Sequence, residues 1–96
     1  MFFKKSNKEL VEVLNETHEL LVKYDNISWE GLSPAEASMD LEIAIDQISK
    51  GKTIHKQHLI TLFLPTGLIQ ECAIANNWND KYLVLSDRFD ALINNL

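Results

Sequence analysis

Cysteine, proline and glycine are scarce in this chain of 96 residues, with one, two and three copies respectively. The single cysteine, Cys72, excludes an intramolecular disulfide and suits a reducing compartment. No apolar run approaches the ~18–20 residues that a helix needs to span a bilayer. The polar segment after Met1–Lys5 lacks the apolar stretch of a signal peptide. The sequence therefore predicts a cytoplasmic protein that does not associate with membranes.

Basic residues are also in the minority. Nine lysines and arginines stand against 14 aspartates and glutamates, which gives a formal net charge of −5. The lysines are dispersed and form no basic stripe on any predicted helix, so we expect no binding of nucleic acid, whose phosphates must be neutralised. An acidic surface instead favours a basic protein partner, mainly because it steers the encounter.

Sustained alternation of apolar and polar residues, which would indicate strands, is missing as well. Apolar residues instead recur at spacings of three and four in five segments, which is typical of amphipathic helices. The composition, with 46% apolar and 24% charged residues, argues against disorder. We therefore predict an all-α fold, a compact bundle of about five helices, in one domain that spans residues 1–96.

Capping residues mark the ends of these helices. Ser6 with Glu9, and Ser33 with Glu36, form capping boxes before the first and second helices, and Pro34 takes the first helical position of the second. A glycine and a pair of asparagines follow the second and fourth helices, where they suit C-terminal caps. The predicted ranges are about 7–24, 34–50, 54–63, 66–76 and 80–94, with C-terminal caps at Gly51 and Asn76–Asn77 and an N-cap at Asn79.

The same spacing predicts which side of each helix is buried. On the first helix these residues are Leu10, Val13, Leu14, Thr17, Leu20, Leu21 and Tyr24, and on the second they are Ala37, Leu41, Ala44, Ile45 and Ile48. The two short helices contribute Leu59, Leu62, Phe63, Leu68, Ile69, Cys72 and Ala73. The last helix contributes Tyr82, Leu83, Leu85, Phe89, Leu92 and Ile93. We expect these residues to form one hydrophobic core.

Motifs that carry catalysis or bind a cofactor are not found. The segment Gly51–Thr53 matches the tail of a phosphate-binding loop, but Asp46 stands where the motif requires another glycine. His55 and His58 place two ligands on one helical face, which is too few for a metal site. Cys72 falls on the inner side of an apolar helix, where a thiol behaves as a small hydrophobe. We therefore predict no enzymatic activity, no bound metal and no cofactor.

Two features indicate a binding surface instead. Glu12, Glu16 and Glu19 recur at spacings of four and three along the first helix and form an acidic stripe, which is either simply solvated or faces a basic partner. Trp29 and Trp78 lie in or beside loops, where a tryptophan either anchors an interface or fills the core. These five residues are the candidate partner-binding residues.

The C-terminal third contains Pro-Thr-Gly-Leu-Ile-Gln-Glu at residues 65–71, then Asn77-Trp78 and Phe89-Asp90. It resembles a group of small uncharacterised bacterial helical proteins that often carry Pro-Thr-Gly-x-x-Gln-Glu, a downstream Asn-Gly-Trp and a terminal Phe-Asp. Asn77 stands where glycine is more usual in that group. In size, acidity and order of helices the chain is also similar to helical immunity proteins of interbacterial toxins. This second resemblance implies tight stoichiometric binding to a cognate toxin.

The resulting hypothesis is a cytoplasmic binding protein of the immunity or antitoxin kind that occludes a basic surface of its partner. The alternative is a structural or regulatory helical module that self-associates as a homodimer through leucine and phenylalanine positions left over from the core. A small enzyme or metal-binding bundle that uses His55 and His58 is the third and least favoured interpretation.

Overall fold

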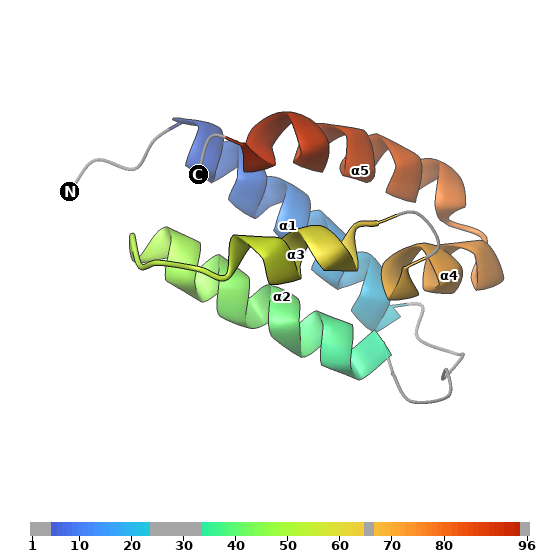
Figure 1. The fold of residues 1–96 in the computed structure, drawn as a ribbon. Helices are drawn as coiled ribbons and strands as arrows, with labels where there is room; N and C mark the ends of the chain where they lie inside the picture. The colour runs from blue at the N-terminus through green and yellow to red at the C-terminus, as the bar shows by residue number, and fades with distance from the viewer. Residues whose placement is uncertain (1–4, 24–33, 65–66, 95–96) are drawn as a thin grey trace.

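The computed structural model describes residues 5–23, 34–64 and 67–94, which form five α-helices and no strand (Figure 1). The helices are α1 (Lys5–Lys23), α2 (Pro34–Ser49), α3 (Lys56–Leu62), α4 (Leu68–Ala75) and α5 (Asn79–Ile93). The radius of gyration is 12.8 Å, close to the ~12–13 Å expected for a compact chain of this length. The predicted all-α fold of about five helices is therefore confirmed.

Helix α1 lies at the centre of the arrangement. It runs antiparallel to α2 on one side and to α5 on the other (Figure 1), and its buried face also reaches α4. The short helices α3 and α4 both pack against α2, and α4 also packs against α5. Because α2 and α5 flank α1, the side of α1 that faces away from the core remains open to solvent. None of the described helices is long and apolar enough to cross a membrane.

One continuous cluster of buried side chains connects the five helices. The rings of Phe63 and Phe89 stack with their centroids 4.1 Å apart, and the ring of Trp78 meets that of Tyr82 edge-on at 6.4 Å. The Tyr82 hydroxyl donates a hydrogen bond of 3.1 Å to the carbonyl oxygen of Phe63. This bond ties the end of α3 to the first turn of α5, and it satisfies the polar end of a core tyrosine.

The prediction of the buried sides is confirmed at most described positions and wrong at Leu83, which is 48% exposed. Successive helical residues are rotated by about 100° around the axis. Leu83 therefore points away from the side that Tyr82, Leu85 and Phe89 share. Four further positions are half-buried at the edge of the core, namely Leu20, Ile45, Leu62 and Leu92. Tyr24 and the side chain of Leu68 lie outside the described part of the chain.

Two helices end in the same hydrogen-bonding motif, as their terminal residues predicted. Beyond α2, Gly51 has φ = 69°, its N–H donates to the carbonyl of Ile48 (3.1 Å), and the N–H of Lys52 donates to the carbonyl of Gln47 (2.8 Å). This pair of bonds is the Schellman motif, which requires a left-handed residue and so favours glycine.

The second such motif lies beyond α4 and uses asparagine. Asn77 has φ = 65°, its N–H donates to the carbonyl of Ile74 (3.3 Å), and the N–H of Trp78 donates to the carbonyl of Ala73 (2.8 Å). Asparagine tolerates the left-handed conformation better than other residues with a Cβ atom. Asn77 thus occupies a left-handed turn of the kind that favours glycine.

The starts of the helices agree less well with the prediction. Helix α1 begins at Lys5, so Ser6 lies inside the helix and is not its N-cap. Helix α5 begins at Asn79 with Trp78 in the cap position, because the motif that ends α4 places α5 directly after it. Helices α3 and α4 begin one or two residues later than expected. Helix α2 begins at Pro34 as predicted, and Ser33 lies outside the described residues.

Candidate functional site

The outer side of α1 carries the predicted acidic stripe. Glu12, Glu16 and Glu19 are all exposed on the side of the helix opposite its buried residues, and we call these three residues the acidic ridge. Between Lys8 and Lys23 the helix contains no lysine or arginine. The middle of α1 therefore presents concentrated negative charge, with compensating lysines only towards its two ends.

Neighbouring helices border the acidic ridge with opposite kinds of charge. On the α5 side, Nη1 of Arg88 donates a hydrogen bond of 3.5 Å to Oε2 of Glu16. On the α2 side, Nε2 of His18 lies 3.0 Å from Oε1 of Glu42, whose side chain is 63% exposed. The pair of Arg88 and Glu16 is largely exposed, with the Glu16 side chain at 54%. It therefore adds only ~0–1 kcal/mol to the free energy of unfolding. The acidic surface thus extends from α1 onto α2.

Exposed aliphatic side chains also occur on α1 and α2. Val22 on α1 is 55% exposed and Met39 on α2 is 61% exposed. The contact between His18 and Glu42 fixes the antiparallel register of the two helices. One helical turn beyond His18 comes Val22, and about one turn before Glu42 comes Met39, so the two side chains lie at the same level of the helix pair. The two helices that carry the acidic surface therefore also expose aliphatic side chains at one level.

The candidate Trp78 does not join this surface. Trp78 is only 4% exposed and packs against Tyr82 in the core, so it fills the interior and is not available to a partner in this conformation. Its indole Nε1 is buried without a hydrogen-bond partner among the described residues. Trp29 lies outside the described residues. Of the five candidate residues, the structure thus brings three together, all of them on α1.

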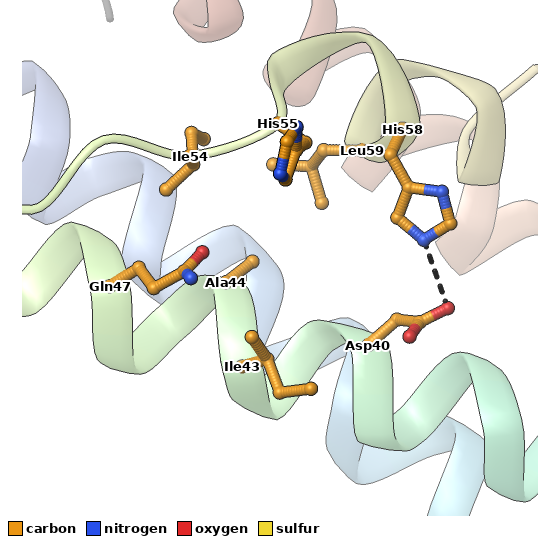
Figure 2. Close-up of a pocket in the computed structure, with 8 residues that line it drawn as sticks. All are labelled: Asp40, Ile43, Ala44, Gln47, Ile54, His55, His58 and Leu59. Atoms are coloured by element: carbon orange, nitrogen blue, oxygen red, sulfur yellow. Dashed lines mark hydrogen bonds and ion pairs between the residues drawn. The ribbon is translucent and has the colours of Figure 1, made fainter.

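The second surface feature is a groove between α2 and α3, and we call it the α2–α3 groove (Figure 2). Its volume is about 90 Å³, and Nε2 of His58 lies 3.1 Å from Oδ2 of Asp40 at one end. The residues that line it are Asp40, Ile43, Ala44, Gln47, Ile54, His55, His58 and Leu59. Among the described residues, no group of three histidine, cysteine or acidic side chains is placed to hold a metal ion. His55 and His58 are both exposed.

Two potentially reactive groups, the thiol of Cys72 and the phenol of Tyr82, are buried in the core. Cys72 is fully buried, which agrees with its predicted position in the core. Burial raises the pKa of the Tyr82 phenol above its ordinary value of 10.0, the hydrogen bond with Ser86 opposes this increase, and the carboxylate of Asp90 adds to it. Neither group lines one of the described grooves. Their burial therefore gives no reason to assign either of them a chemical role.

The sequence analysis missed the contribution of α2 to both features. Helix α2 carries four carboxylates, Glu36, Asp40, Glu42 and Asp46, and no lysine or arginine within its bounds. Their positions away from the buried stripe of α2 were visible in the spacing of the sequence. Two of the four have histidine partners, Glu42 with His18 on α1 and Asp40 with His58 on α3. The spacing of the sequence did not show these contacts, because they join residues 24 and 18 positions apart.

Comparison with protein families, with curated proteins and with solved structures finds no match to this chain. Its function must therefore be argued from its own residues. Among the described residues, the acidic ridge with its extension onto α2 and the α2–α3 groove are two surface features that offer chemistry to a partner.

Proposed function

We propose that this protein binds a basic partner protein through the acidic ridge and neutralises it by stoichiometric occlusion, as immunity and antitoxin proteins do. The observation that carries the proposal is the exposure of Glu12, Glu16 and Glu19 in the base-free middle of α1. In this proposal the partner is a toxin, the protein acts in the cytoplasm, and it has no enzymatic activity of its own.

The arrangement of charge in α1 is difficult to explain by stability alone. Glutamates at spacings of three and four repel each other and destabilise a helix by ~0.2–0.5 kcal/mol per pair. An isolated surface helix is better stabilised by alternating opposite charges at the same spacings. A basic partner, in contrast, is steered towards such a surface and associates with it faster.

The exposed aliphatic side chains of α1 and α2 support the same proposal. Interfaces combine a desolvated apolar centre with a polar rim. Val22 and Met39 supply exposed aliphatic surface, and Glu19 and Glu42 supply carboxylates on the same two helices. Charge alone gives little net affinity between exposed groups, so this apolar surface is needed for tight binding.

A self-associating structural or regulatory module is the second candidate function. It is favoured by exposed aliphatic side chains elsewhere on the molecule, such as Ile74 on α4 and Leu83 and Val84 on α5. The two candidates differ in the occupant of the surface, since one requires a basic protein and the other a second copy of this chain.

The test is a charge reversal of the acidic ridge. The triple variant Glu12→Lys/Glu16→Lys/Glu19→Lys changes the formal charge by two at each position, from −5 to +1. Its affinity for the partner identified by co-purification should fall sharply, mainly through slower association. The effect should shrink between 0.1 M and 1 M salt, because the Debye length falls from ~10 Å to ~3 Å.

A matched control uses three exposed aspartates of α5. The variant Asp80→Lys/Asp87→Lys/Asp90→Lys undergoes the same change in charge on another side of the molecule, and it should retain most of the affinity. Circular dichroism must show that both variants remain helical. Equal losses of affinity in the two variants would mean that only the net charge matters. Unchanged affinity of the ridge variant at low salt would mean that the ridge is a solvated surface and not an interface.

A further inference from the structure

We propose that the α2–α3 groove is a binding site for an arginine side chain of a protein partner. In this proposal the guanidinium contacts the carboxylate of Asp40, and the aliphatic stem lies along the apolar wall. This inference rests on the proposed function only in taking the partner to be basic. It concerns a different surface, because the residues that line the groove belong to α2, to α3 and to the segment before α3, and none of them is on α1.

The two ends of the groove differ in chemistry (Figure 2). Asp40 and His58 stand at one end, and Gln47 and Ile54 stand at the other. Between them the wall is made by the aliphatic side chains of Ile43, Ala44 and Leu59. A purely apolar side chain would leave the carboxylate unused, and a small cation would leave the apolar wall uncovered. A cation at the end of a long aliphatic stem matches both parts.

Charge complementarity identifies the occupant as basic. Helix α2 has four carboxylates and no lysine or arginine within its bounds, and Asp40 is the one of the four that lines the groove. The Asp40 side chain is 37% exposed, and its contact with His58 uses only Oδ2. The second oxygen of the same carboxylate is therefore left for another donor. A guanidinium presents a planar pair of N–H groups that matches a carboxylate, whereas an ammonium is a point charge, so arginine fits this end better than lysine.

The exposure of His58 suits this occupant. The His58 side chain is 61% exposed, so it can rotate away from Asp40 without disturbing the core. An exposed pair of this kind contributes little to stability, and an incoming guanidinium can therefore replace it.

The direct test is a nuclear magnetic resonance titration of the isotopically labelled protein with the peptide Ac-Ala-Arg-Ala-NH2. We expect shifts concentrated at the residues that line the groove, with weak but saturable binding. Two control peptides replace arginine by citrulline, which keeps the shape and removes the charge, and by norleucine, which keeps only the apolar stem. Both should bind more weakly, by up to about fivefold, as expected for the loss of a partly exposed charge pair.

Matched variants separate the groove from general attraction to an acidic protein. Asp40→Asn should weaken the arginine peptide about fivefold. Asp46→Asn should not, although Asp46 is also on α2, is 56% exposed and is also ion-paired, with Lys50. Ile43→Ser should weaken binding because Ile43 lines the groove, whereas Met39→Ser, one turn away and outside the lining, should not. His58→Ala should strengthen binding, because it frees Asp40.

Several outcomes would overturn the inference. Equal binding of the citrulline or norleucine peptide would remove the cation from the argument. Shifts spread along α1 that do not respond to Asp40→Asn would show unspecific attraction to acidic surface. Concentration-dependent self-association that Ile43→Ser abolishes would make a second copy of the chain the occupant.

The result can be separated from that of the proposed function. If the arginine peptide binds in the groove but reversal of the acidic ridge leaves partner affinity unchanged, the ridge fails and the groove stands. If reversal of the ridge abolishes partner binding while Asp40→Asn alters neither peptide nor partner affinity, the groove alone fails.

Discussion

Burial of single side chains on α5 shows how strongly the position of a residue around one helix determines its contribution to the free energy of unfolding. Phe89 is fully buried and stacks on Phe63, whereas Leu83, six residues earlier, is about half exposed. Both are large apolar residues, so the difference arises from the angle at which each leaves the helix. The two residues therefore provide an internal comparison of buried and exposed apolar surface.

We predict that Phe89→Ala lowers the free energy of unfolding by ~3–5 kcal/mol, because it removes a stacked ring and leaves a cavity. Leu83→Ala should change it by less than ~0.5 kcal/mol, as is usual at surface positions away from special features. Urea denaturation followed by circular dichroism measures both. A large loss from Leu83→Ala would mean that this side chain is covered in solution, for instance by a second copy of the chain.

At the scale of the helices, the two Schellman motifs determine where α2 and α4 end and how the chain continues. Gly51 and Asn77 have nearly the same backbone angle, with φ of 69° and 65°. Glycine adopts this conformation without a steric cost, whereas a residue with a Cβ atom is strained in it. The motif at Asn77 also brings Trp78 directly into position for α5.

The two positions should respond in opposite directions to substitution. Gly51→Ala should destabilise the protein by ~1–2 kcal/mol, since alanine is strained in the left-handed region. Asn77→Gly should be stabilising or neutral, within about 1 kcal/mol, because it removes strain but adds freedom to the unfolded chain. Thermal denaturation of the two variants checks this, and a destabilising effect of Asn77→Gly comparable to that of Gly51→Ala would show that the asparagine side chain matters more than the backbone angle.

Helix ends also show which local signals were reliable. The C-terminal signals at Gly51 and Asn77 were correct because a left-handed residue closes its own hydrogen bonds within six positions of the chain. The N-cap predictions for Ser6 and Asn79 were wrong, since several side chains in succession can occupy a cap and packing selects among them.

At the scale of the whole molecule, exposed aliphatic side chains are widely distributed. They occur on α1, α2, α4 and α5 and in the segment after α3, and among the described residues they are Val22, Met39, Ile43, Leu64, Ile74, Leu83 and Val84. Apolar residues scattered over a surface are normal in monomeric proteins. A stable homodimer instead needs a continuous and largely apolar interface.

We therefore predict a monomer of 11.0 kDa at micromolar concentration, as measured by light scattering coupled to size-exclusion chromatography. The net charge of −5 adds repulsion between copies, so lowering the salt concentration should not produce a dimer. A mass twice as large would favour the self-associating module over the proposed binding of a basic partner. In that case, Leu83→Ser and Ile43→Ser would show which side of the molecule forms the dimer.

Local patterns were sufficient to predict five helices, most of their buried sides and the exposed glutamates of α1. This follows because helical periodicity, capping and left-handed turns all act between residues a few positions apart. Contacts between helices were needed for everything else about the candidate sites. Only packing shows that Trp78 is interior, that Glu42 faces His18, and that Asp40 meets His58 across a groove. Those contacts join residues far apart in the chain, and their geometry depends on how neighbouring helices cover each other's edges, which no local pattern encodes.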